Sequence, residues 1–175
     1  DYQVGTVLHF AAHTVVPESV SDPLKYYRNN TCNTRNLLEC CARHGVDHFI
    51  FSSTAAVYGL PDAATKTREG ALKEWQWLNP SGMYGCNKLY CELIGNYLSR
   101  NQGSSASTIL DFRAIRFPGL ISAETLPTGG TTDYAPEMIH AAAKGEAYAC
   151  FVRPDTRIPF MAMPDGGNAL LDLAA

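Results

Sequence analysis

Short apolar segments of strand type alternate along this chain with longer segments of helix type, and this alternation limits the possible folds most. The strand-type segments cover residues 4–10, 48–51 and 109–117, and the helix-type segments cover residues 23–41, 83–98 and 136–144. A helix between two strands allows the chain to return and lay the second strand parallel to the first. The sequence therefore predicts an α/β fold, a parallel sheet with flanking helices.

The segments between these elements are less regular. Residues 60–80 form a polar stretch with proline, glycine and many charges, and residues 101–108 are rich in glycine and serine, so we expect surface loops at both places. We also expect a further strand over residues 148–152 and a short helix after Pro164.

Charge and cysteine content narrow the possible partners. The chain has 14 basic and 17 acidic residues, a net charge of −3, which argues against non-specific binding to nucleic acid or to a membrane. No apolar run approaches the ~20 residues of a membrane span, and nothing resembles a signal peptide. The six cysteines form no Cys-x-x-Cys pair, so we expect reduced thiols in the cytoplasm and no metal site.

Each predicted strand is followed by small or polar residues. Ala11-Ala12 follow the first strand, Ser53-Thr54 follow the second, and Pro118-Gly119 follow the third. In parallel sheets, ligands bind outside the carboxyl ends of the strands. We therefore expect these three strand ends to line one crevice.

Tyr84 and Lys88 lie four residues apart on the helix predicted over residues 83–98, which places them on one helix face. A free phenol titrates near pKa ~10 and is a poor base at neutral pH, but a neighbouring ammonium lowers that pKa. The spacing alone also suits an exposed tyrosine beside a solvated lysine. Next to the strand ends, however, the pair predicts a centre of proton transfer, with Lys88 lowering the pKa of Tyr84.

Together these residues resemble the extended short-chain dehydrogenase/reductase family, in which Ser or Thr follows one strand and Tyr-x-x-x-Lys lies on the next helix. The matching residues are Thr54, Tyr84 and Lys88. The resemblance implies that Tyr84 is the general acid/base, that Lys88 binds the nicotinamide ribose, and that Thr54 hydrogen-bonds the reacting oxygen. It also implies a Rossmann-like sheet, NAD as cofactor and a homodimer.

The same resemblance assigns the remaining site residues. Those expected to contact the cofactor are Phe10, Ala11, Ala12, Asn29, Ser52, Tyr84, Lys88, Phe117 and Pro118. Those expected to contact the substrate are Ser53, Thr54, Tyr84, Thr131, Thr132 and Arg157. Two alternatives stay open here, because Thr131 and Thr132 equally suit a helix cap and Arg157 equally suits a solvated ion pair.

Two branches of the family are visible in different parts of the chain. Residues 7–59, with His-Phe-Ala-Ala and Phe-Ser-Ser-Thr-Ala-Ala-Val-Tyr-Gly, resemble UDP-galactose 4-epimerase. Residues from about 83 onward, with Phe-Arg-Ala-Ile-Arg-Phe-Pro-Gly and Gly-Gly-Thr-Thr-Asp-Tyr-Ala, resemble L-threonine 3-dehydrogenase. The resemblance implies oxidation of a secondary alcohol with hydride transfer to NAD. The alternatives are a UDP-glucose/UDP-galactose 4-epimerase, with a nucleotide-sugar substrate in place of an amino acid, and a non-catalytic fragment or pseudoenzyme.

The family begins with a strand and a Gly-x-x-Gly-x-x-Gly loop whose backbone amides bind the cofactor pyrophosphate. No such loop is present in this sequence, so we expect a fragment whose sheet is incomplete at the N-terminus. By the resemblance, residues 1–122 are a partial NAD-binding domain and residues 123–175 a partial substrate-binding region. We therefore expect this chain alone to bind NAD weakly or not at all.

Overall fold

The structure is a computed structural model that describes residues 3–60, 72–100, 110–127, 129–130 and 132–175. Three strands, β1 (Thr6–His9), β2 (His48–Thr54) and β3 (Asp111–Phe117), form a parallel sheet with β2 in the centre. In the register, His48 pairs with both Thr6 and Asp111. This confirms the predicted parallel α/β fold.

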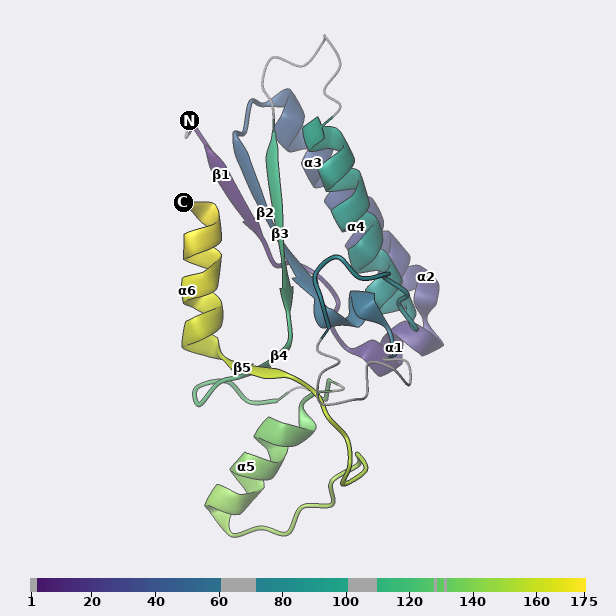
Figure 1. The fold of residues 1–175 in the computed structure, drawn as a ribbon, viewed down its shortest axis with the longest axis vertical. Coiled ribbons are helices and arrows are strands. Elements are labelled where there is room, and N and C mark those ends of the chain that lie inside the picture. Colours follow the sequence, from purple (N-terminus) through teal and green to yellow (C-terminus); the bar gives the residue numbers. More distant parts are fainter. Residues whose placement is uncertain (1–2, 61–71, 101–109, 128, 131) are drawn as a thin grey trace.

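Helices cover both faces of this sheet, as Figure 1 shows. On one side lie α1 (Val16–Ser21), α2 (Pro23–Tyr26), the π-helix η1 (Tyr27–Cys32), α3 (Asn33–Arg43) and α4 (Met83–Arg100). On the other side, α6 (Met163–Ala174) packs against β2 and β3. The end of the chain therefore returns to the first sheet, while the division at residue 122 stays a prediction.

The helix predicted over residues 23–41 is present, but it contains a feature that periodicity did not predict. Its central turn widens into η1, and this turn directs Asn30 and Thr31 into the interior, where both are buried. The Thr31 hydroxyl donates to Asn87 Oδ1 of α4 at 2.9 Å. The wider turn thus joins the two helices through buried polar groups, which a count of apolar residues could not reveal.

A smaller unit follows β3. Strands β4 (Gly119–Ile121) and β5 (Phe160–Ala162) pair in parallel, and α5 (Tyr134–Lys144) lies between them in sequence. The strand predicted over residues 148–152 is wrong, because these residues are mostly exposed and have no strand assignment. β4 pairs with β5 instead of with residues 148–152. Strand pairing, and not local propensity, therefore decides where the strand forms.

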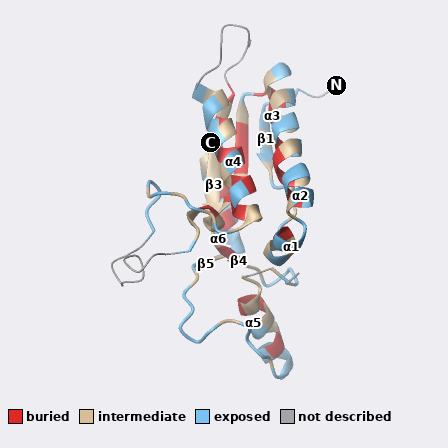
Figure 2. Cartoon of the chain, turned by 90° about the vertical axis from the view of Figure 1, so that its right-hand side faces the viewer, coloured by how far each residue is buried: buried red, intermediate tan, exposed pale blue. Residues whose placement is uncertain are grey.

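The hydrophobic core lies between the central sheet and the helices α3 and α4 (Figure 2). The Phe112 ring of β3 stacks on Phe49 and Phe51 of β2, with ring centroids 5.8 and 6.1 Å apart. Leu38 of α3 is fully buried against this cluster. No helix in the described ranges is both long and apolar enough to cross a bilayer. The predicted loop at 101–108 and residues 61–71 of the predicted polar stretch lie outside those ranges.

We expect Gly95→Ala to lower the free energy of unfolding by a net amount of up to about 2 kcal/mol, because overpacking costs about 1–3 kcal/mol. A Cβ at Gly95 would lie 2.2 Å from the Phe112 ring, which has no room to move within the core. The gain in helix propensity, about 1 kcal/mol, offsets this only in part. Urea unfolding of Gly167→Ala is the matched control, because a Cβ at that helical glycine meets nothing within 4 Å. Equal midpoints for the two variants would contradict the expectation.

Candidate functional site

The first turns of α4 bring Tyr84 and Lys88 to the carboxyl end of β2. The Lys88 ammonium donates to the backbone oxygen of Ser52 at 2.6 Å. The whole Lys88 residue is only 4% exposed. Its Nζ lies 4.8 Å from the ring centroid of Phe51 and 5.9 Å from that of Tyr84. The predicted pairing of Tyr84 and Lys88 on one helix face is therefore present, and it faces the sheet.

Thr54 ends β2 and begins the 3-10 helix η2 (Ala55–Tyr58) as its N-cap residue. The Ala56 backbone N–H donates to Thr54 Oγ1 at 3.2 Å, which holds the Thr54 side chain at this turn. The same side chain lies near enough to the Tyr84 phenol to lower the pKa of that phenol. The structure thus joins Thr54, Tyr84 and Lys88 in one cluster, as the sequence predicted.

The titration behaviour of the pair differs from the sequence-based prediction. Burial raises the pKa of Tyr84, and the interaction with Thr54 opposes that rise only in part. Burial lowers the pKa of Lys88 to about 8. The predicted lowering of the Tyr84 pKa by Lys88 is therefore wrong for this structure, because the cost of burying the phenolate outweighs the other influences.

We expect Lys88→Met to be more stable than the parent at pH 7 by up to about 3 kcal/mol. The parent must bury an ammonium whose pKa falls from 10.5 to about 8 on folding. Between these two pH values the unfolded chain binds more protons, so the stability of the parent rises with pH there. Urea unfolding from pH 7 to 10.5 should show the variant's advantage shrinking. An advantage that stayed constant over this range would contradict the expectation.

The residues predicted to contact the cofactor gather at the carboxyl edge of the sheet. The register pairs Thr54 with Phe117, so β2 and β3 end level with each other, whereas β1 ends earlier, with His9 level with Phe51. Phe10 is 51% exposed at this edge. The remaining members of this edge group are Ala11, Ala12, Ser52 and Pro118. Asn29 lies in η1, where its amide donates to Asn30 Oδ1 at 2.9 Å.

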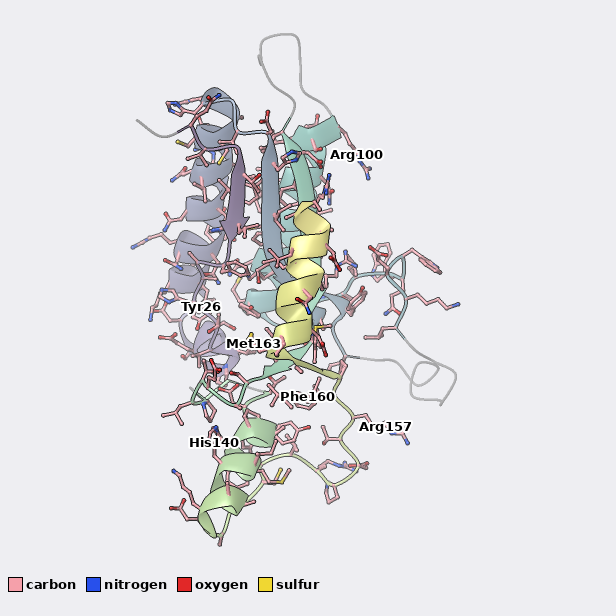
Figure 3. The ribbon with its side chains drawn as sticks, turned by 90° about the vertical axis from the view of Figure 1, so that its left-hand side faces the viewer. Tyr26, Arg100, His140, Arg157, Phe160 and Met163 are labelled. Carbon is pink, nitrogen blue, oxygen red and sulfur yellow. The ribbon has the colours of Figure 1, made fainter. Side chains whose placement is uncertain are left out.

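The residues predicted to contact the substrate are less closely grouped. Ser53 is buried and its hydroxyl donates to the Glu92 carboxylate. Thr132 lies against the beginning of β4, and the N-cap residue of α5 is Asp133, so the alternative role of Thr132 as N-cap residue is not seen. Arg157 is exposed in the segment that leads into β5 (Figure 3). Thr131 lies outside the described residues.

Sequence reasoning missed a buried ion pair next to this cluster. Arg116 of β3 donates from Nη2 to Glu92 Oε2 at 2.6 Å and from Nε to both carboxylate oxygens at 3.0 and 3.1 Å. The side chains of Glu92 and Arg116 are only 4% and 20% exposed. The sequence spacing could have identified Glu92, because it follows Lys88 by four residues and so lies on the helix face that carries Tyr84.

A second polar group lies beneath Lys88. His9 Nε2 and Thr34 Oγ1 share a hydrogen bond of 2.8 Å, and the His9 ring packs at an angle to Phe49 and Phe51. Burial, with a smaller contribution from the charge of Lys88, lowers the pKa of His9.

Comparisons with known proteins identify relatives of this chain. Residues 1–174 match the sequence model of the NAD dependent epimerase/dehydratase family. The mitochondrial L-threonine 3-dehydrogenase of Bos taurus is 35% identical over 144 residues, which are 82% of this chain and 35% of that protein. A UDP-glucose 4-epimerase of Azospirillum brasilense is 48% identical over 92 residues, 53% of this chain and 25% of that protein.

Solved structures show the same likeness across nearly the whole chain. An L-threonine dehydrogenase from Cupriavidus necator in its holo form superposes with a TM-score of 0.85 at 32% identity, covering 98% of this chain and 52% of that one. The enzyme of the same name from Phytophthora infestans gives 0.84 at 34% identity, with the same coverages. The chain thus spans about half the length of these structures.

Proposed function

The chain belongs to the NAD dependent epimerase/dehydratase family, and from this we propose that it supplies the proton-transfer centre of an L-threonine 3-dehydrogenase. The observation that carries the proposal is the cluster of Thr54, Tyr84 and Lys88 at the carboxyl ends of β2 and β3. The similarity to L-threonine dehydrogenases over 98% of the chain supports the choice of substrate.

The residues at the sheet edge fit a nicotinamide cofactor. The small side chains of Ala11 and Ala12 leave room beside an exposed aromatic ring, Phe10, at the end of β1. Lys88 has one donor committed to Ser52 O, and an ammonium has three donors in all. When bound, NAD would accept a hydride from the substrate carbon, and we propose that Lys88 and the residues of this edge hold it there.

The remaining steps follow from the chain's own residues. Thr54 would hold the substrate oxygen by a hydrogen bond, and Tyr84 would exchange a proton with that oxygen. Because burial raises its pKa, Tyr84 rests protonated at neutral pH, the form that donates a proton. Oxidation of the alcohol requires the phenolate, which the interaction with Thr54 favours.

The proposal is tested by NADH formation from L-threonine and NAD. We would measure it first on this chain and then on a hybrid in which the chain replaces the matching segment of the Cupriavidus necator enzyme. Calorimetric titration with NAD tests the expectation that the chain alone binds weakly or not at all, and micromolar binding would contradict it. A folded hybrid that binds NAD but forms no NADH from L-threonine would refute the proposed substrate.

A UDP-hexose 4-epimerase is the second candidate, supported by the 48% identity to the Azospirillum brasilense enzyme. The same Tyr84 and Thr54 would then serve oxidation and re-reduction of one sugar carbon. Arg157, if it lines the site, suits a nucleotide phosphate because its guanidinium binds phosphate through two parallel hydrogen bonds. Conversion of UDP-galactose with no net NADH distinguishes this activity from that of a dehydrogenase.

We also propose a homodimer that works in the cytoplasm. Leu24 of α2 is 72% exposed and Leu93 of α4 is 60% exposed, with Tyr90 one turn before it. Such apolar side chains on helices that pack together suit burial against a second copy. Sedimentation of Leu93→Glu against the parent tests this, and a parent that is monomeric at high concentration would refute it.

A further inference from the structure

The ion pair of Glu92 and Arg116 connects the elements that carry the cluster. Glu92 lies on α4, Arg116 lies on β3, and the carboxylate accepts three hydrogen bonds from the guanidinium. Arg116 Nη1 also donates to the Tyr58 hydroxyl at 3.0 Å and to the Glu74 backbone oxygen at 3.0 Å. The fixed fork of one guanidinium therefore joins four separate segments of the chain.

This pair is hydrogen-bonded to residues on both sides of Thr54 in the sequence. The residue before it, Ser53, donates its hydroxyl to Glu92. After it, the helix η2 that Thr54 caps ends at Tyr58, whose hydroxyl accepts from Arg116. Neither Ser53 nor Tyr58 can move without stretching a hydrogen bond to the pair, so the position of Thr54 between them is fixed.

The same pair fixes the helix that carries Tyr84. Glu92 lies two turns after Tyr84 and one turn after Lys88, so all three side chains lie on the α4 face that meets the sheet. Near the start of α4, a Cβ at Gly85 would lie 2.7 Å from the Ala56 backbone oxygen. The helix thus meets η2 directly at one end and is anchored by Glu92 to the strands farther along.

We infer that Glu92 and Arg116 are positioning residues that set the distance between Thr54 and Tyr84. The inference rests on the proposed function, since it concerns the same proton-transfer centre. Stability alone does not account for the pair, because apolar residues of similar volume often replace a buried ion pair without loss. Precise placement does account for it, since each of its hydrogen bonds has a defined direction and, apart from the one to the Glu74 backbone oxygen, ends on a segment next to Thr54 or on α4.

The inference predicts a shift in the titration of Tyr84. The Thr54 hydroxyl lowers the pKa of Tyr84 and so favours the phenolate, and Thr54→Val should therefore raise the titration midpoint by about one pH unit. The paired substitution Glu92→Gln with Arg116→Met removes both charges together, and we expect at least half of the Thr54→Val shift. In the Thr54→Val background it should add almost nothing, because both changes act through the same hydroxyl.

The titration is followed by fluorine NMR of chain containing 3,5-difluorotyrosine, whose more acidic phenol titrates closer to neutral pH. Tyr84→Phe identifies the signal. The matched control is Asp111→Asn with Arg113→Met, which removes a second arginine–carboxylate pair of β3 at the opposite end of the strand. The titration contains no cofactor or substrate, so its result does not depend on turnover. If the expected shift is seen but the hybrid forms no NADH from L-threonine, the proposed function is refuted and the positioning role stays intact.

Three outcomes would overturn the inference. They are a shift below half of that of Thr54→Val, an equal shift in the control variant, and an undiminished shift in the Thr54→Val background. If the paired variant fails to fold, Tyr58→Phe decides, because it removes only the hydroxyl that joins Arg116 to η2. A smaller rise in the Tyr84 midpoint would then support the positioning role, and an unchanged midpoint would refute it.

Discussion

Replacement of Tyr84 by phenylalanine is expected to reduce NADH formation from L-threonine by about 10²–10⁴-fold, the usual contribution of a positioned acid/base. The substitution removes only the hydroxyl that lies near Thr54, and the ring can stay in place near Lys88. The free energy of unfolding should therefore change little. Rates are compared in the hybrid enzyme at saturating cofactor, where binding of NAD is measured separately by calorimetry.

Tyr90→Phe is the matched control for this change. Tyr90 lies on the same helix, is 48% exposed, and should tolerate the loss of its hydroxyl with an unchanged rate. A Tyr84→Phe variant that kept the full rate would show that Tyr84 is not the acid/base, and a parent hybrid that binds NAD but has no activity on any of the proposed substrates would favour the third alternative, a pseudoenzyme. Equal losses in both variants would instead point to a general disturbance of α4.

The strand and helix pattern was sufficient to predict the central sheet, because β2 and its neighbours are apolar and each is separated from the next by a helix. It failed at residues 148–152, where strand propensity is present but no strand within the described ranges pairs with them. It also failed at η1, because a π turn differs from an α turn by a single residue and leaves the apolar period almost unchanged. Pairing and turn geometry are properties of the folded chain and not of a local window.

The candidate site residues were identified in a different way, and their roles stay predictions. Tyr84, Lys88 and Thr54 were found through their spacing and their place after strands, and the structure joins them. Glu92 and Arg116 were missed because they lie 24 residues apart and each alone looks like an ordinary charged residue. The pKa of Tyr84 was also missed, since spacing shows which charge is near but not how much water is excluded.

Arg116→Met alone is expected to lower the free energy of unfolding by about 3–5 kcal/mol, the second largest effect. The change leaves the buried Glu92 carboxylate with Ser53 as its remaining hydrogen-bond partner among those described above. An ionised carboxylate in that position must either stay uncompensated or take up a proton, and both raise the energy of the folded chain. Urea unfolding at pH 7 gives the loss directly.

Two further variants identify its cause. Arg113→Met on the same strand breaks an ion pair whose side chains are 34% and 39% exposed, and water can solvate the Asp111 carboxylate that remains, so we expect a loss of about 0–1 kcal/mol. Adding Glu92→Gln to Arg116→Met removes the stranded charge and should restore most of the lost stability. If the double variant were as unstable as Arg116→Met, lost packing and not a buried charge would be the cause. Recovery of stability without recovery of the Tyr84 midpoint would separate the two roles of the pair, because folding needs the charges balanced whereas Thr54 needs the hydrogen bonds themselves.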